Sequence, residues 1–401
     1  MKANRNYGLL LSSQFLGAFG DNTILAIILG QLTLKAGRGE ITDKELSIAN
    51  AVFTTLLFIP YFLLAPIAGY LNDRFPKTQW LLGGNAIKLL GTVVAVTGMW
   101  MGTDLQGVGY FIVGIGACIY SPAKYGILPE LLPSDRLVKA NGTVEMLTLV
   151  AILTGSITGA KLIDTLPVYQ CYAIQIGIYG LSLILNWAMT ATPSDPTVQL
   201  RSSVQAFFGH TRYLLTASRL SRILLGTTLF WICGAVIKMN FQPWGLNTLG
   251  LKNNTSIALL GLWLSLGIMA GSVLAGQIHK VGDVRRTRLY GWLLGCLILV
   301  LSQVNGRYSV IVFLVLAGLC AGLFLIPLNA ALQAESPQSK LGKTIAVQNF
   351  MENLAMSMGG AVVMLVSKST SITAPSVFVG LAVVVLFASS GLRIPEKSNQ
   401  S

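Results

Sequence analysis

Long apolar runs recur along the whole chain and are separated by short polar connectors. A helix needs about 20 apolar residues to cross the roughly 30 Å hydrocarbon core of a bilayer, and each run has about that length. The pattern therefore predicts twelve membrane-spanning helices. Their expected ranges are 7–34, 47–72, 80–101, 107–127, 138–163, 168–190, 223–246, 256–279, 287–304, 308–332, 343–366 and 372–393.

One connector is longer than the others. In residues 191–222, apolar side chains alternate with Arg201, Arg212 and Arg219 at roughly helical spacing. Such a pattern is typical of an amphipathic helix that lies in a membrane interface. The sequence thus predicts three parts: an N-terminal six-helix bundle over 1–190, a cytoplasmic linker with an amphipathic helix over 191–222, and a C-terminal six-helix bundle over 223–401.

The composition excludes a soluble protein, because 53% of the residues are hydrophobic and only 11% are charged, against about 25% charged in soluble domains. The net charge of +13 does not indicate nucleic-acid binding. The bases lie in short connectors, and no basic stripe is interleaved with aromatic residues. The first apolar run, 7–34, is too long for a signal peptide, so we expect it to be the first span.

Neither the cysteines nor the histidines indicate a metal, cofactor or catalytic site. The five cysteines fall inside apolar segments without CxxC spacing, and we expect them to be small buried hydrophobes. His210 and His279 lie in or beside connectors, where we expect solvated side chains. A lipid-modifying enzyme is disfavoured because the chain has neither a GxSxG elbow nor an HxxxxD acyltransferase pattern.

The basic residues of the connectors predict the orientation in the membrane. With the N-terminus inside, 18 Lys and Arg residues fall on the inner side, seven on the outer side and three within spans. Connectors rich in Lys and Arg remain in the cytoplasm. We therefore expect both termini to be cytoplasmic.

Ionic residues interrupt several of the expected spans. They are Asp21, Lys88, Lys124, Glu145, Lys238 and Glu352. A charge inside a span costs roughly 2.5–3.5 kcal/mol on insertion scales and usually faces a water-filled path. Three acids and three bases can neutralise one another, so we interpret them as the lining of one polar path. Two interpretations stay open for Lys88: a path residue, or a structural lysine whose head reaches the membrane surface.

Two stretches, Ala117–Leu147 and Ala321–Met356, repeat one design in the two halves of the chain. Each holds a helix with a proline near its end, a polar turn, and a second helix that carries an acid. In the second stretch a polar stripe follows at helical spacing, formed by Gln348, Asn349, Glu352 and Asn353. Amides can simply join helices within a membrane, but the carboxylate favours a place on the path.

The connector between the second and third spans carries Gly69, Asp73, Arg74 and Lys77 in the segment GYLNDRFPK. The glycine permits close helix packing and the charges can bridge helix ends, so we expect a cytoplasmic gate; anchoring at the inner surface is the simpler alternative. The segment resembles the signature between helices two and three of the major facilitator superfamily, with Pro76 where glycine is usual. The resemblance implies an all-α integral membrane fold of twelve transmembrane helices, in two six-helix bundles with pseudo-twofold symmetry.

A closer resemblance covers nearly the whole chain. The segments QFLGAFGDN, SPAKYGIL, VKANG, LFW and AVQNFMEN together resemble the bacterial lysophospholipid transporters. The resemblance implies that lysophosphatidylethanolamine and lysophosphatidylglycerol move from the outer to the inner leaflet of the cytoplasmic membrane, where a separate acyltransferase/acyl-carrier-protein synthetase re-acylates them. An exporter of drugs or other amphiphiles from the same superfamily is the alternative.

By the same resemblance, the charged path consists of Asp21, Lys124, Lys238 and Glu352. We expect the two lysines to meet the phosphate, and the two acids to pair with these lysines when the site is empty. The family pattern has arginine at the position of Lys238, and lysine contacts phosphate as a point charge rather than as a fork. The full expected substrate-binding set is Asp21, Asn22, Lys124, Glu145, Lys238, Gln348, Asn349 and Glu352.

Overall fold

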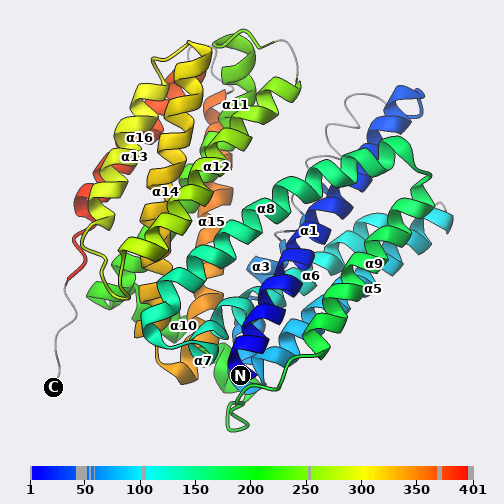
Figure 1. Ribbon diagram of the computed structural model, residues 1–401, viewed down its shortest axis with the longest axis vertical. Helices are drawn as coiled ribbons and strands as arrows, with labels where there is room; N and C mark the ends of the chain where they lie inside the picture. The colour runs from blue at the N-terminus through cyan, green and yellow to red at the C-terminus, as the bar shows by residue number, and fades with distance from the viewer. Residues whose placement is uncertain are drawn as a thin grey trace. The chain divides into compact units, whose positions relative to one another are not determined.

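The computed structural model describes residues 2–41, 52–53, 56–57, 59–101, 105–251, 254–367 and 373–395. Within these ranges the regular structure consists of helices, and no strand is present (Figure 1). Nine helices of the described part are long and apolar enough to cross a membrane. A tenth apolar helix, α13 (Thr287–Leu301), is shorter.

Helices occupy the first six expected spans. They are α1 (Lys2–Gly37), α3 (Ile59–Leu63) and α4 (Ala65–Arg74), α5 (Lys77–Met101), α6 (Leu105–Gly126), α8 (Leu137–Thr165) and α9 (Val168–Trp187). The second span is interrupted, because α3 and α4 are separate short helices. Its expected first residues, 47–51, lie outside the described ranges. The short α7 (Leu128–Leu131) and the 3-10 turn η1 (Ser134–Arg136) connect α6 to α8.

The last six expected spans are also helical. They are α11 (Ser218–Asn247), α12 (Asn254–Ile278), α13, α14 (Arg307–Glu335), α15 (Leu341–Ser367) and α16 (Ala374–Gly391). The 3-10 turn η2 (Gln338–Lys340) precedes α15 and matches η1 before α8. The repeated design predicted for the two polar stretches is therefore present in the local structure of both halves.

The chain forms two compact units. The first contains Met1–Leu132, Leu147–Phe208 and Pro337–Asn349; the second contains Pro133–Met146, Gly209–Ser336 and Phe350–Ser401. The first turns of α8 thus belong to the second unit, and those of α15 belong to the first. The division at 191–222 that was inferred from connector length stays a prediction.

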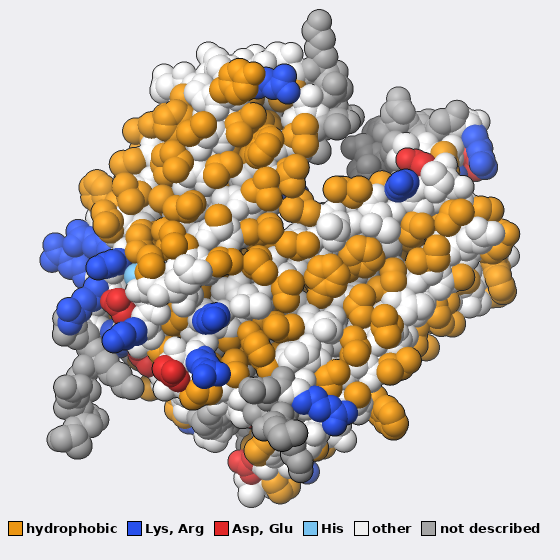
Figure 2. Space-filling model, viewed as in Figure 1, with side chains coloured by type: hydrophobic (Ala, Val, Ile, Leu, Met, Phe, Trp, Pro, Cys, Tyr) orange, Lys and Arg blue, Asp and Glu red, His pale blue; other side chains and the backbone are white. Residues whose placement is uncertain are grey.

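Small residues let helices approach closely in both units. A Cβ atom on Gly91 of α5 would lie 2.5 Å from the carbonyl oxygen of Gly109 in α6, and one on Gly322 of α14 would lie 2.5 Å from that of Ile268 in α12. Contacts of this kind replace the hydrophobic effect, which does not draw apolar helices together in lipid. Hydrophobic side chains, orange in Figure 2, cover much of the visible surface.

The long connector contains the predicted helix, α10 (Leu200–Thr216). Its apolar residues do not share one environment, because Phe207 and Leu214 are buried while Phe208 and Leu215 are exposed. His210 on the same helix is only 6% exposed, so the expectation of a solvated histidine was wrong here. The helix packs through one stripe that includes the imidazole.

Candidate functional site

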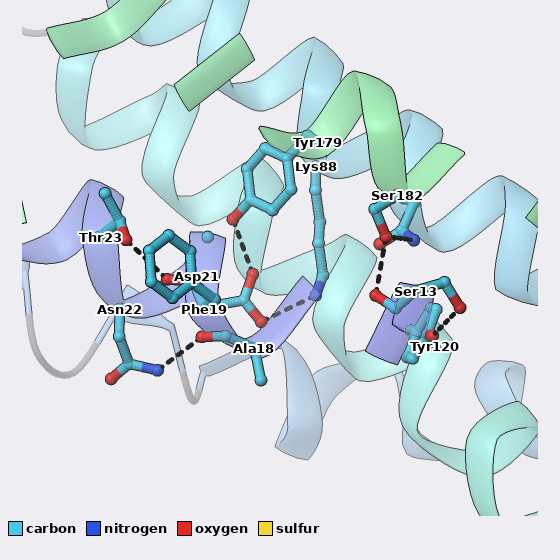
Figure 3. Close-up of polar contacts among 12 residues, drawn as sticks. Ser13, Ala18, Phe19, Asp21, Asn22, Thr23, Lys88, Tyr120, Tyr179 and Ser182 are labelled. Atoms are coloured by element: carbon cyan, nitrogen blue, oxygen red, sulfur yellow. Dashed lines mark hydrogen bonds and ion pairs between the residues drawn. The ribbon is translucent and has the colours of Figure 1, made fainter. Parts of the chain in front are cut away.

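An ion pair lies inside the first unit, between the first span and the third. Lys88 Nζ of α5 lies 2.7 Å from Asp21 Oδ2 of α1, and the hydroxyl of Tyr179 in α9 donates a hydrogen bond of 2.7 Å to Asp21 Oδ1 (Figure 3). Helices α1, α5 and α9 pack against one another. The acid on α1 therefore meets the base on α5 and the phenol on α9.

The partner of Asp21 corrects the sequence-based expectation, which paired this acid with Lys124 or Lys238. The sequence shows that Asp21 lies on a helix, but it does not show which neighbouring helix that face meets. Gly17, one turn before Asp21, leaves the required space, because a Cβ atom there would lie 3.6 Å from Lys88 Nζ. The glycine makes room for the lysine head beside the carboxylate.

Lys88 is 2% exposed, so its side chain does not reach a membrane surface. Its Nζ lies 5.2 Å from the ring centroid of Tyr120 and 5.9 Å from that of Tyr179. A buried ammonium needs a counter-ion and other electron-rich neighbours to offset the loss of water. The carboxylate and the two rings supply both, and the interpretation of Lys88 as a snorkelling residue is excluded.

Hydroxyl and amide groups extend this network along the first unit. Ser182 of α9 donates to the carbonyl oxygen of Ser13 at 2.8 Å, and Asn85 donates to Ser182 Oγ at 2.6 Å. Ser13 Oγ lies 3.4 Å from the hydroxyl of Tyr120 (Figure 3). The sequence reading missed Tyr179, Tyr120 and Ser182. Polar groups within apolar spans were the available signal, since buried polar groups require partners.

Asn22 points elsewhere. Its Nδ2 donates a hydrogen bond of 2.8 Å to the carbonyl oxygen of Ala18 in its own helix (Figure 3). Consecutive residues of a helix point about 100° apart, so Asn22 does not join the Asp21 pair. Its expected contact with substrate stays a prediction.

The other expected site residues are distributed over both units. In the first unit, Lys124 is half-buried with its Nζ 4.5 Å from the ring centroid of Tyr125, and Asn349 Nδ2 donates to Ser121 Oγ at 3.0 Å. Gln348 beside it is buried. In the second unit, Glu145 and Glu352 are 3% and 6% exposed, whereas Lys238 of α11 is exposed. Two carboxylates thus lie inside apolar helices of that unit.

The expected gate residue Asp73 makes a long-range contact in the first unit. It accepts a hydrogen bond of 2.8 Å from the backbone N–H of Gly342 at the start of α15, and Lys343 Nζ lies 3.3 Å from its other oxygen. A Cβ atom on Gly69 would lie 3.1 Å from the Cα of Lys343. Burial raises the pKa of Asp73 to about 6, although Lys343 acts in the opposite direction. Asp73 therefore holds the first turn of α15 against α4.

The two basic residues of the same segment, Lys77 and Arg74, form contacts within the first unit. Lys77 forms an ion pair with Glu130 of α7, and Arg74 donates to the carbonyl oxygen of Val198. The backbone N–H of Asp195 donates to the carbonyl oxygen of Arg74 at 3.0 Å. These contacts hold the segment against the helix ends and the long connector, while Gly69, Asn72 and Asp73 lie against the first turn of α15.

The second unit contains a related arrangement. A Cβ atom on Gly276 of α12 would lie 2.9 Å from the Cα of Lys139 in the first turn of α8. Close by in sequence, His279 is 5% exposed, with Nε2 3.0 Å from the hydroxyl of Tyr290 and Nδ1 3.5 Å from Asp283 Oδ2. Burial lowers the pKa of His279 despite the neighbouring carboxylate. The expectation of a solvated histidine was therefore wrong here as well.

Two polar contacts of the second unit had no sequence-based prediction. Asn141 of α8 and Gln333 of α14 exchange two amide hydrogen bonds, of 2.9 and 2.8 Å. Arg219 of α11 forms a bidentate ion pair with Glu335, in which both nitrogen–oxygen distances are 2.7 Å. Both are pairs far apart in sequence, which residue spacing alone does not reveal. They join the ends of α8, α11 and α14.

Among the described residues, no cluster of three or more His, Cys, Asp or Glu side chains could hold a metal ion. Four of the five cysteines are buried as expected, but Cys296 is exposed, which corrects the prediction for that residue. The long apolar helices, with paired ions inside them, define an integral membrane protein with polar groups at the depth of the bilayer.

Comparisons with known proteins agree with this class. The family model described as "Major Facilitator Superfamily" matches residues 10–360. The crystal structure of the human organic anion transporter MFSD10 is similar at a TM-score of 0.82, with 15% identity, 98% of this chain covered and 100% of that chain. The fucose:proton symporter of E. coli is similar at a TM-score of 0.70, with 15% identity, 98% of this chain covered and 99% of that chain. Both show the fold alone.

Closer relatives exist among curated bacterial proteins. The lysophospholipid transporter LplT of Photorhabdus laumondii is 35% identical over 86% of this chain and 85% of its own length. The protein of the same name from Enterobacter sp. is 34% identical over 94% and 92%. The chain therefore belongs to the major facilitator superfamily and, within it, to the family of these bacterial transporters. The predicted twelve-helix membrane fold is confirmed.

Proposed function

We propose that this protein moves lysophospholipids, with ethanolamine or glycerol head groups, from the outer to the inner leaflet of the bacterial cytoplasmic membrane. The observation that carries this proposal is the 33–35% identity to lysophospholipid transporters over most of the chain. The product would be re-acylated by a separate acyltransferase/acyl-carrier-protein synthetase. The proposal places both termini in the cytoplasm, in line with the excess of basic residues in the inner connectors.

The ions within the expected spans suit a substrate with a charged head. A phosphate or ammonium group that crosses hydrocarbon alone loses its hydration, and fixed ions of opposite sign offset that loss. Lys124 and Lys238 would contact the phosphate, while Asp21 and Glu352 would attract an ethanolamine ammonium. Because Lys88 and Tyr179 already engage Asp21, the ammonium would have to compete with Lys88 for the carboxylate.

The remaining residues of the expected set have smaller roles in this proposal. Glu145, Gln348 and Asn349 would line the path near the phosphate, and Asn22 would contact the substrate only after releasing its own helix carbonyl. Gln348 and Asn349 are consecutive residues of α15, and their amide groups can also bind a glycerol head. With carboxylates for an ammonium group and amides for a glycerol group, one site would accept both kinds of head group.

An apolar groove of the second unit suits the single acyl chain. It has a volume of about 530 Å³ and is lined by Met146, Leu266, Met269, Ala270, Val273, Leu274, Gln277 and Leu319. Volumes of roughly 300–1,000 Å³ are usual for small-molecule sites. Flexible methionine side chains adapt to chains of different shape. Met146 of this lining follows the buried Glu145 directly in the sequence.

The contact of Asp73 with Gly342 and Lys343 would act as the cytoplasmic gate, together with Gly69 and the anchoring bases Arg74 and Lys77. Transporters of this superfamily alternate between access from two sides. A gate requires a contact that can form and break. One backbone hydrogen bond and one ion pair of 3.3 Å meet that requirement better than an extended apolar interface would.

Leaflet-resolved uptake of labelled lysophosphatidylethanolamine into proteoliposomes tests the function, with a cationic dye as a parallel substrate. We expect lysophospholipid uptake, and loss of uptake with unchanged expression in Lys238→Ala. The matched control is Lys161→Ala, because Lys161 is an exposed lysine of α8 outside the proposed path. Transport of the dye but not of the lysolipid would assign the protein to the exporters of drugs and would overturn the proposal.

A further inference from the structure

One face of α13 forms a shallow open groove of about 540 Å³ on the second unit. Its lining consists of Arg285, Arg288, Leu289, Trp292, Leu293 and Cys296. From Arg288 to Cys296 the positions follow one another by one, three, one and three residues, which is one stripe along α13. Arg285 lies in the turn just before the helix. At 1.5 Å per residue the helical part of the stripe is roughly 12 Å long. It therefore extends from the connector before α13 well into the apolar part of the helix.

The stripe faces outward. Leu289, Trp292 and Leu293 are 55%, 42% and 43% exposed, whereas Leu294 and Ile298 on the opposite side of α13 are buried. The buried side packs against α14 and α16. In a membrane, an outward apolar stripe of this kind is covered by lipid. The polar end of the groove can favour one kind of lipid head group over another.

The polar end of the groove carries two positive charges and no acid among its lining residues. Arg288 takes part in none of the ion pairs found in the described part of the chain. A guanidinium group binds phosphate through two parallel hydrogen bonds. Trp292, one turn beyond Arg288, has the side chain that is enriched at head-group depth. The order of arginine, tryptophan and leucine thus matches phosphate, interface and acyl chain.

The corresponding helix of the first unit uses its charges differently. Trp80-Leu81-Leu82-Gly83 of α5 repeats Trp292-Leu293-Leu294-Gly295 of α13. Near the start of α5, however, Lys77 is paired with Glu130, and the ring of Trp80 packs on Phe75 at 5.8 Å. The second copy of the motif instead has arginines at its polar end, beside an open groove.

We propose that this α13 groove binds one anionic phospholipid of the cytoplasmic leaflet, with its phosphate on Arg285 and Arg288 and an acyl chain along Leu289, Leu293 and Cys296. Basic grooves on the cytoplasmic side of membrane proteins bind anionic head groups. A zwitterionic lipid would bring its own ammonium beside two guanidinium groups and is disfavoured. The inference rests on the proposed orientation of the chain and is independent of which substrate the protein transports.

Cys296 provides the test, because it lies at the apolar end of the groove and is the exposed one of the five cysteines. The full chain is purified in detergent, and the rate of Cys296 alkylation is followed by peptide mass mapping with added phosphatidylglycerol or phosphatidylcholine. We expect phosphatidylglycerol to slow alkylation at concentrations about 30-fold lower than phosphatidylcholine, since each of the two arginines near a phosphate contributes roughly 1 kcal/mol.

The double variant Arg285→Gln/Arg288→Gln should abolish this preference. Arg286→Gln is the matched control, because Arg286 is exposed and precedes α13 but does not line the groove; it should keep the preference. Native mass spectrometry of the same proteins should show one retained phosphatidylglycerol that the double variant loses. Size-exclusion profiles of all variants establish that they are folded.

Three results would overturn the proposal. Equal protection by both lipids would mean ordinary surrounding lipid, and protection by inorganic phosphate alone would mean an anion site without an acyl chain. Protection that rises with protein concentration in the absence of added lipid would assign the face to a second copy of the chain.

Discussion

Lys88 Nζ lies 2.7 Å from Asp21 Oδ2, although 67 positions separate the two residues in the sequence. Both belong to the first unit, so this ion pair does not depend on the second half of the chain. A buried ion pair is weak evidence for stability, because desolvation offsets most of the attraction between the charges. Here the pair gives each buried charge a counter-ion inside the first unit.

Replacing one partner of this ion pair should lower the thermal stability of the protein more than replacing both partners. Lys88→Met or Asp21→Asn alone leaves a buried charge without its counter-ion, which costs about 3–5 kcal/mol, whereas the double variant leaves none. Thermal unfolding in detergent should therefore rank both single variants below the double variant. Lys161→Met, at an exposed position of α8, should unfold like the parent protein. A double variant less stable than either single one would contradict the buried-pair interpretation.

Tyr179→Phe should weaken the same site without changing its charge. The substitution removes the phenol that donates to Asp21 at 2.7 Å, and hydrogen bonds to charged groups contribute about 1.5–3 kcal/mol. We expect a lower unfolding temperature and a changed ratio between lysophosphatidylethanolamine and lysophosphatidylglycerol uptake, because Asp21 becomes more available to an ammonium. The control is Tyr169→Phe, since Tyr169 is 56% exposed. An unchanged uptake ratio would separate Tyr179 from head-group recognition.

The class of the protein could be predicted from the sequence because span length and loop charge are local properties. Each expected span needed only about 20 apolar residues, and the chain supplies them repeatedly. The interrupted second span is the exception: α3 ends at Leu63 and α4 begins at Ala65, within a segment that reads as one apolar run. Hydropathy does not register a local break of this kind.

The partners of the charged residues could not be predicted in the same way. Helical spacing places Asp21 on one face of α1, but the rotation of α1 against α5 and α9 depends on packing of the whole unit. The same reason explains the two buried histidines and exposed Cys296, since each was assigned from its position along the chain. For Asp73 the expected contact with a neighbouring helix end is present, because a charged segment at helix ends has few elements within reach; its part in a gate stays a prediction.

The hydrogen bond from the Gly342 backbone N–H to Asp73 should depend on pH. The pKa of Asp73 is about 6 in this buried contact, against about 3.9 for an exposed aspartate. The buried contact thus binds the proton more tightly than an opened state that exposes Asp73 to water. Protonation favours the contact: the added stabilisation is complete below about pH 4 and is lost as the pH rises through 6, a change of roughly 100-fold in the equilibrium.

Hydrogen exchange can follow this equilibrium through a peptide that includes Gly342. After correction for the intrinsic rate, protection should fall between pH 4 and 6 in the parent protein. In Asp73→Asn the dependence should disappear, because the amide accepts the hydrogen bond but does not titrate. A peptide from the middle of α14, which has no such contact, should behave alike in both proteins. Constant protection in the parent protein would mean that Asp73 remains buried in every populated state.

Gly69 and Gly276 should be sensitive to substitution in the same way, since each accommodates the first turn of a polar helix. A Cβ atom on Gly69 would lie 3.1 Å from the Cα of Lys343, and one on Gly276 would lie 2.9 Å from the Cα of Lys139. These neighbours are backbone atoms, so the helix itself must shift. Gly69→Ala and Gly276→Ala should each lower thermal stability by about 1–3 kcal/mol, the usual range for overpacking, with the larger loss at Gly276.

Gly177→Ala in α9 is the matched control, because apart from its own stretch of helix no atom lies within 4 Å of the added Cβ. An alanine there should stabilise the helix by up to about 1 kcal/mol. Uptake should fall in the two sensitive variants and remain normal in the control, since a displaced α8 or α15 changes the segments that carry Glu145 and Glu352. If all three variants behaved alike in unfolding and uptake, close packing at Gly69 and Gly276 would have no special part in the transport cycle.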